Sequence, residues 1–263
     1  MAKKFYVVWQ GRTPGIYTDW NSCKQQVDKF AGAKYKSFPT MAEAEQAFVG
    51  SHGASTTKKG TAVKKASSTS AKSATKPNTI KTYTAAEIAK MNTDVMIFTD
   101  GGCDPNPGQA GSGMAVYRDG KIAELWYGLY NPMGTNNTAE LNALHQALMM
   151  AQIESNQGKS VTIFCDSKYS IQCVTQWAIG WQKKGWKKAG GEIKNLELIK
   201  EMFALHQQLK DKIQVLHVNG HVGVEGNELA DRMSMIAIAE KETEFTRYPD
   251  EINVAEILKM QAG

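Results

Sequence analysis

Cysteine, proline and long apolar runs are all scarce in this sequence of 263 residues. None of its four cysteines (Cys23, Cys103, Cys165 and Cys173) belongs to a Cys-x-x-Cys pair, which argues against a disulfide framework and against a thiolate zinc site. No apolar run reaches the roughly 18 residues of a membrane span, and the apolar stretch near the N-terminus is too short for a signal peptide. These absences predict reduced thiols, no membrane span and a cytoplasmic location.

Acidic residues are unevenly spread along the chain. Residues 51–90 contain eight lysines and a single acid, Glu87, for a net charge of +7, and residues 1–50 carry +3. Because the whole chain carries +5, residues 91–263 carry −5. Residues 51–92 are rich in Ser, Thr, Ala and Lys and cannot bury enough surface to offset their ordering entropy. We interpret them as a flexible basic linker between a small and a large domain.

Residues 1–50 carry the pattern of a small α/β domain in the order ββαβα. Strands are expected at 4–9, 16–18 and 34–38, and helices at about 20–30 and 40–48. Asp19 or Asn21 is suited to cap the first helix, and a capping box at 40–43 opens the second.

Residues 93–240 alternate between the two-residue periodicity of strands and the roughly 3.6-residue periodicity of helices, which is the pattern of a larger α/β domain. Strands are expected at 95–99, 112–118, 122–130, 161–165 and 213–218, with helices at 138–151, from 168, at 195–209 and at 227–239. Asp119-Gly120 is a strong hairpin signal between the second and third strands. The order predicts a mixed five-stranded sheet with helices on both faces. The tail, 241–263, is expected to form a short docked helix and is assigned no chemistry.

Four acidic residues are placed to gather at one edge of this sheet. Asp100 and Asp166 follow strands that can be neighbours, and ligands gather at the carboxyl ends of strands. Glu140 lies on the first turns of the next helix, and Asp231 follows a Gly-rich loop. Taken singly, each acid is better explained as a turn former, a helix cap or a surface charge. Taken together, they would repel one another unless cations bind between them.

Oxygen ligands of this kind suit Mg²⁺, with Mn²⁺ as an alternative, and do not suit zinc. Two such ions can clamp a phosphate for in-line hydrolysis of a phosphodiester. His221, in the Gly-rich loop, is the candidate for moving protons or releasing product. We interpret His145, His206 and His217 as structural.

Four segments of the sequence resemble those of a known family. The segments FTDGGCDPNPG from Phe98, TNNTAE from Thr135, FCDS from Phe164 and HVGVEGNELAD from His221 resemble, in order and spacing, the signature segments of type 1 ribonuclease H, across nearly all of 93–240. The resemblance implies an endonuclease that cuts the RNA strand of RNA–DNA hybrids and leaves a 5′-phosphate and a 3′-hydroxyl. It also implies that two Mg²⁺ ions are bound by Asp100, Glu140, Asp166 and Asp231, and that His221 assists turnover.

The stretch 175–195 interleaves tryptophans with lysines, as nucleic-acid binding surfaces do. Trp177 and Trp181 are four residues apart and share a helix face, and we interpret them as a binding face and Trp186 as core. The stretch resembles the basic protrusion of many type 1 enzymes, in which the aromatics hold the sugars of the DNA strand.

The resemblance also implies which polar residues contact each strand. Asn106, Asn136 and Asn137 would contact the RNA strand, where 2′-hydroxyls distinguish RNA from DNA. Thr135 and Asn195 would grip a phosphate of the DNA strand. The sequence departs from the family at two positions near that phosphate. Met133 stands where several relatives carry Arg, and Ala189 where some carry Ser.

About 45 residues of the N-terminal piece resemble the small hybrid-binding domain that precedes many type 1 enzymes. The family's duplex-contacting positions match Trp20, Tyr35 and Lys36, while its second basic position is Ser37 here. From the residues alone, Trp20 and Tyr35 are equally suited to form the core of so small a domain.

The expected partner is therefore an RNA–DNA hybrid duplex, with no obligatory protein partner. Two other functions stay open. One is a different metal nuclease on the same fold, such as a transposase-like or junction-cutting enzyme. The other is a non-catalytic protein, a degenerate nuclease that keeps the fold only to bind nucleic acid.

Overall fold

The computed structural model describes residues 5–38, apart from 11, 13, 14, 29 and 31, and residues 80–263, apart from 189, 190, 221 and 222. The chain divides into two compact units, residues 1–73 and residues 74–263, which we describe separately. No helix in these described ranges has the length and apolar character that crossing a bilayer requires.

The first unit is a three-stranded antiparallel sheet with one helix described on it. Its elements are β1 (Phe5–Gln10), β2 (Gly15–Tyr17), α1 (Trp20–Val27) and β3 (Lys34–Phe38), and the strand order is β2-β1-β3. Asp19 caps α1, as expected, by accepting a hydrogen bond from the backbone N–H of Ser22 at 2.9 Å. Val8 and Cys23 are fully buried between sheet and helix. The helix predicted at 40–48 lies outside the described residues.

The second unit is built on a sheet of seven strands, in the order β10-β7-β6-β5-β8-β9-β4. The strands are β4 (Thr82–Tyr83), β5 (Val95–Asp104), β6 (Gly108–Arg118), β7 (Lys121–Gly134), β8 (Val161–Cys165), β9 (Ile213–Val218) and β10 (Thr246–Arg247). The five long strands are the five predicted ones, with β5, β6 and β7 antiparallel and β5, β8 and β9 parallel. Asp119 and Gly120, both at positive φ, make the predicted two-residue hairpin turn, since Arg118 pairs with Lys121.

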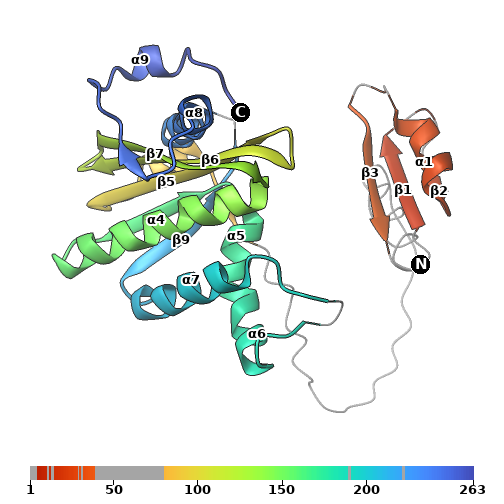
Figure 1. Ribbon diagram of the computed structural model, residues 1–263, viewed down its shortest axis with the longest axis horizontal. Coiled ribbons are helices and arrows are strands. Elements are labelled where there is room, and N and C mark those ends of the chain that lie inside the picture. Colours follow the sequence, from red (N-terminus) through yellow and green to blue (C-terminus); the bar gives the residue numbers. More distant parts are fainter. Residues whose placement is uncertain are drawn as a thin grey trace, which may run out of the picture. The chain divides into compact units, whose positions relative to one another are not determined.

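Helices cover both faces of this sheet (Figure 1). They are α3 (Ala85–Ile88), α4 (Asn136–Asn156), α5 (Lys168–Gln172), a π-helical turn (Cys173–Trp177), α6 (Ala178–Lys183), α7 (Leu196–Leu209), α8 (Glu225–Glu240) and α9 (Val254–Ile257). On one face, α4 and α7 bury a large cluster that includes Ile97, Leu144 and Ile199. On the other face, α8 buries a second cluster around Phe98, Phe164 and Leu229. The fold class predicted from the sequence is confirmed.

Both edges of the sheet are extended by short strands that the sequence did not predict. Strand β4 comes from residues 80–92, which we assigned to the linker, and it pairs in parallel with His217 and Val218 of β9. Tyr83 and Ile88 pack against the second core cluster, which orders this stretch in spite of its polar composition. At the opposite edge, β10 of the tail pairs with β7, and the short tail helix is present as α9 with Ile257 buried.

Candidate active site

Two of the predicted carboxylates lie side by side, Asp100 within β5 and Asp166 directly after the neighbouring parallel strand β8. Thr99 of β5 pairs with Cys165 of β8, so the residues that follow them, Asp100 and Asp166, are adjacent at the same edge. Strand β5 does not end at Asp100, as the sequence suggested, but continues to Asp104 because it stays paired with β6. Asp100 is therefore held rigidly within the sheet.

Helix α4 brings Glu140 against β5. Thr135 caps the helix by accepting a hydrogen bond from the backbone N–H of Thr138, so Glu140 lies in the first turns. A Cβ atom at Gly101 would lie 2.2 Å from the backbone nitrogen of Glu140, so only glycine allows the helix so close. From the neighbouring strand β6, Ser112 Oγ donates to the carbonyl oxygen of Ala139 at 2.8 Å. These contacts fix Glu140 beside Asp100.

Helix α8 places Asp231 near Asp100 from the other face of the sheet. The hydroxyl of Ser234, one turn further along, lies 2.8 Å from the carbonyl oxygen of Asp231 and 3.1 Å from Asp100 Oδ2, and it donates toward both. Asn227 Nδ2, on the first turn of α8, donates to Asp166 Oδ2 at 3.3 Å. The sequence did not single out Ser234 or Asn227, because each faces a partner distant in the chain.

Two of the four carboxylates, Asp100 and Glu140, are strongly perturbed by their surroundings. Burial raises the pKa of Asp100 well above its usual range, and the charges of Asp166 and Asp231 raise it further, against the opposing effect of the Ser234 hydrogen bond. Burial likewise raises the pKa of Glu140, with Asp100 and Asp166 adding to the shift and the Gly101 N–H opposing it. Burial is the larger cause for both groups, and the repulsion between like charges that the sequence led us to expect adds to it.

The residues fit divalent cations. Glu140 is 5% exposed, and its Oε2 atom accepts no hydrogen bond from the part of the chain that the structure describes. In the same part of the chain, neither Glu140 nor Asp100 forms an ion pair with Lys, Arg or His. A buried carboxylate oxygen that lacks a donor is costly unless a cation meets it. The group of four is therefore a candidate metal centre.

Two groups of the protein donate hydrogen bonds to the Asp231 carboxylate. The guanidinium of Arg232 pairs with its Oδ2, and the backbone N–H of Gly263 donates to its Oδ1 at 3.0 Å. Arg232 also donates to the carbonyl oxygen of Leu258 at 3.4 Å. The tail, to which the sequence assigned no chemistry, thus reaches a predicted metal ligand.

His217 lies next to the carboxylate group and contacts the backbone of Asp166. His221, the predicted proton carrier, lies outside the described residues. His217 is 3% exposed, and its Nε2 lies 3.0 Å from the carbonyl oxygen of Asp166 while its Nδ1 lies 2.8 Å from Thr82 Oγ1. A carbonyl oxygen only accepts, so Nε2 carries the proton and Nδ1 of the neutral ring accepts from Thr82. His217 is structural, as we predicted, and it braces the backbone of Asp166.

Four of the predicted strand-contacting residues, Asn106, Thr135, Asn137 and Asn195, line one pocket of about 480 Å³. Its lining residues are Asn106, Thr135, Asn137, Thr138, Tyr169, Lys194 and Asn195. Asn136 joins them through its backbone N–H, which donates to Asn106 Oδ1 at 3.3 Å. Asn195 is held by a hydrogen bond from Thr138 Oγ1 at 3.2 Å. Met133, on the nearby end of β7, is 75% exposed and supplies no charge.

The aromatic and basic stretch forms an irregular helical arm. Trp177 and Trp181 share a face, with ring centroids 5.9 Å apart across the π-helical turn and α6. Trp177 is exposed, whereas Trp181 is half-buried against the first core cluster. Trp186 packs edge-on against Phe203 at 6.0 Å, which agrees with its assignment to the core. The lysines Lys183, Lys184, Lys187 and Lys188 are all exposed.

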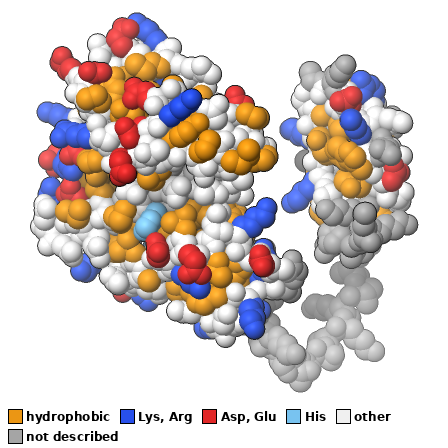
Figure 2. Space-filling view, in the orientation of Figure 1, with side chains coloured by type: hydrophobic (Ala, Val, Ile, Leu, Met, Phe, Trp, Pro, Cys, Tyr) orange, Lys and Arg blue, Asp and Glu red, His pale blue; other side chains and the backbone are white. Residues whose placement is uncertain are grey.

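The small unit presents its aromatics outward. Trp20 and Tyr35 are 42% and 46% exposed, with ring centroids 5.8 Å apart, and Lys36, the next residue of β3, is exposed with its Nζ 5.8 Å from the centre of the Phe38 ring. They are therefore not the core, which is formed around Val8 and Cys23. Figure 2 shows hydrophobic side chains gathered on one face of this unit with Lys and Arg side chains at the margin.

The mixed sheet and the buried carboxylate group together define an α/β domain of the nuclease class. A family model described as RNase H matches residues 92–238, and a second, described as Ribonuclease H1 N-terminal domain, matches residues 4–48. The chain belongs to the ribonuclease H family and is a ribonuclease H enzyme.

Individual relatives cover both units. The mouse protein named Ribonuclease H1 is 34% identical over 255 residues, which cover 88% of this chain and 87% of the mouse protein. The human protein of the same name is 32% identical over 256 residues, with the same coverage of both chains. Among solved structures, LC9-RNase H1, a type 1 RNase H, superimposes with a TM-score of 0.50 at 23% identity, covering 63% of this chain and 81% of that one. The last likeness concerns the fold alone.

Proposed function

We propose that the chain hydrolyses the RNA strand of RNA–DNA hybrids with two divalent ions held by Asp100, Glu140, Asp166 and Asp231. Mg²⁺ is the proposed ion, with Mn²⁺ as an alternative, and the products are a 5′-phosphate and a 3′-hydroxyl. The observation that carries the proposal is the convergence of four carboxylates, from two neighbouring strands and from helices on both faces of the sheet, on a site whose burial and mutual repulsion call for cations. Bound ions would supply charge neutralisation and an activated water for in-line displacement.

The protein's own groups position the substrate. Asn106, Asn136 and Asn137 would donate to and accept from the 2′-hydroxyls of the RNA strand, which only RNA offers. Thr135 and Asn195, in the same pocket, would hold a phosphate of the DNA strand. Trp177 and Trp181 would pack against DNA sugars, beside exposed lysines that neutralise the backbone. His221 would move a proton or help product to leave.

The decisive experiment is cleavage of a hybrid labelled separately on each strand, with Mg²⁺ and with chelator. We expect cuts in the RNA strand only, none after chelation, and products that a 5′-phosphate-dependent exonuclease degrades. Double-stranded DNA, double-stranded RNA and a four-way junction serve as the substrate panel. Cutting of DNA or of the junction in preference to the hybrid would favour the other metal nucleases of this fold. Binding of the hybrid without any cutting would favour a non-catalytic protein.

The small unit is expected to anchor the enzyme on its substrate. A second binder on a flexible tether makes the second contact intramolecular, so deleting residues 1–50 should weaken hybrid affinity by on the order of 100-fold. It should also reduce the number of cuts per encounter, measured with an excess of unlabelled competitor. The double substitution Trp20→Ala and Tyr35→Ala in the full chain should reproduce the loss, since both rings are exposed. Unchanged affinity and unchanged cuts per encounter after the deletion would remove the anchoring role.

A further inference from the structure

One buried cysteine lies inside the carboxylate group and has no part in the proposed reaction. Cys165, the last residue of β8, is fully buried and directly precedes Asp166. Its Sγ makes a long contact of 3.8 Å with the carbonyl oxygen of Ser167. A buried thiol is usually an inert apolar filler. Cys165 differs from such a thiol because the carboxylates of Glu140 and Asp166 lie next to it.

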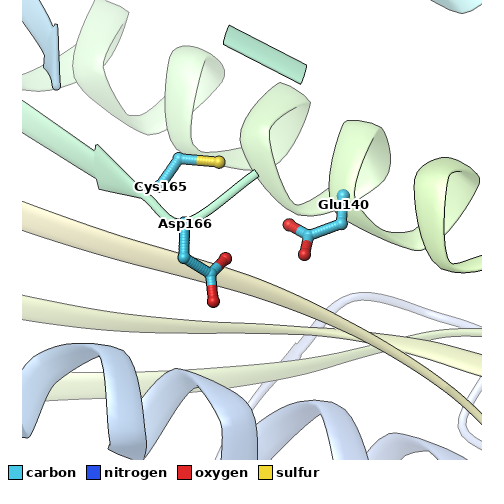
Figure 3. Close-up of side chains that lie close together, drawn as sticks. All are labelled: Glu140, Cys165 and Asp166. Carbon is cyan, nitrogen blue, oxygen red and sulfur yellow. The ribbon is translucent and has the colours of Figure 1, made fainter. Parts of the chain in front are cut away.

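Ligand atoms of Glu140, Cys165 and Asp166 all lie within 4.8 Å of one another. Figure 3 shows the sulfur of Cys165 pointing toward α4 and the carboxylate of Glu140 pointing back toward the loop after β8. Glu140 is 95% buried, and its Oε2 accepts no hydrogen bond from any described residue. One sulfur and two carboxylate oxygens therefore lie near one another, although the Asp166 carboxylate points away from the Cys165 sulfur in Figure 3.

This mixture of ligands selects a different ion from the one that the reaction needs. Mg²⁺ takes oxygen ligands in octahedral geometry and does not favour sulfur. Zn²⁺ and Cd²⁺ favour thiolate, and zinc accepts three protein ligands and a water in a tetrahedron. Tetrahedral ligands around zinc lie about 3.5 Å from one another, so the atoms of this group need to close by only about 1 Å.

We propose that Glu140, Cys165 and Asp166 form a thiolate-containing site for Zn²⁺ or Cd²⁺, and that filling it inhibits the enzyme. The inhibition, though not the binding, rests on the proposed function, because the ion would take two of the carboxylates that hold the catalytic ions. Binding breaks the S–H bond of Cys165 and forms a metal–sulfur bond. The proton passes to solvent, and no group changes oxidation state. Cysteine spacing in the sequence argued against a thiolate zinc site, because the ligands come from two elements distant in the chain.

The test is a Cd²⁺ titration of the full chain, read out by the ultraviolet thiolate-to-cadmium charge-transfer band. The same titration is followed by hybrid cleavage at fixed Mg²⁺, with each variant's rate expressed relative to its own rate without Cd²⁺. The variants are Cys165→Ser and Cys165→Ala, and the matched control is Cys103→Ser, a half-buried cysteine outside the group. We expect the wild type and Cys103→Ser to show the band and inhibition. Both Cys165 variants should lack the band and need about tenfold more Cd²⁺, or about 1.4 kcal/mol, for half inhibition.

The outcomes separate this proposal from the proposed function. No band in the wild type, or an equal band in a folded Cys165 variant, would overturn the soft-metal site whatever the enzyme cleaves. A Cys165-dependent band in a protein that cuts no substrate would support the site and count against the nuclease. A Cys165-dependent band with equal inhibition of all variants would overturn the inhibitory part of the proposal.

Discussion

Replacing Asp100 by Asn is expected to abolish nearly all hybrid cleavage while leaving the protein folded. Asp100 lies at the centre of the group, facing Asp166 and Asp231, and is 7% exposed. The amide keeps the shape and can still accept from Ser234, but it removes the charge that holds the cations. Metal ions contribute several kcal/mol to such reactions, so the rate should fall by about 10³-fold. Single-turnover cleavage with saturating enzyme measures this loss without a contribution from binding.

The same substitution is expected to stabilise the metal-free protein at neutral pH. The folded-state pKa of Asp100 is raised, so the folded protein holds this proton more tightly than the unfolded chain does. Its stabilising contribution is therefore fully present below the unfolded pKa of about 3.9 and is lost as the pH rises through the folded pKa. Asn cannot ionise, so the variant does not lose this stability as the pH rises. Each kcal/mol by which the variant exceeds the wild type raises the melting temperature by roughly 2–4 °C for a domain of this size.

Added Mg²⁺ should make the wild type more stable than Asp100→Asn. An ion that binds only the folded state stabilises the wild type, whereas the variant binds it weakly. The control is Asp211→Asn, which removes the same charge from an exposed turn between α7 and β9 and should change neither cleavage nor the response to Mg²⁺. Full activity in Asp100→Asn would remove Asp100 from the metal centre.

The carboxylate group could be predicted from the sequence because local signals and topology agree. Asp100 and Asp166 each follow an apolar run, and parallel strands place such residues at one edge. Glu140 and Asp231 each lie near the start of an amphipathic helix that must cover the sheet. These rules place elements to within a turn or a register position, which is enough to bring four acids together.

The contacts that hold the group in place could not be predicted, since each depends on residues far apart in the chain. Thr82 reaches His217 only because β4 pairs with β9, and neither residue carries a local signal for that pairing. Ser234 bonds to Asp100 because α8 lies close on β5 and β6. The contact of Gly263 with Asp231 depends on the path of the tail. Periodicity reports which face of an element is buried, and it does not report which partner that face meets.

Gly101→Ala is the second substitution expected to have a large effect, although it touches no charged group. The new methyl carbon would lie 2.2 Å from the backbone nitrogen of Glu140 and 2.4 Å from the carbonyl carbon of Ala139. Backbone cannot rotate aside as a side chain can, so α4 must move away from β5. Overpacking of this kind costs about 1–3 kcal/mol of stability. A shift of about 1 Å in a catalytic group costs about 100-fold in rate, and the shift here falls on Glu140.

A comparison with Gly180→Ala separates this steric effect from the general effect of changing glycine. Gly180 lies in α6, and a methyl group there meets nothing within 4 Å. Alanine in an open helical position should raise stability by about 0.4–1 kcal/mol, measured by urea unfolding. Gly101→Ala should instead lower the urea midpoint and weaken Mg²⁺ binding, as measured by calorimetry, because Glu140 has moved from its partners. Unchanged metal binding and cleavage in Gly101→Ala would mean that α4 can retreat without carrying Glu140 away, and that the close approach of helix and strand does not set the geometry of the site.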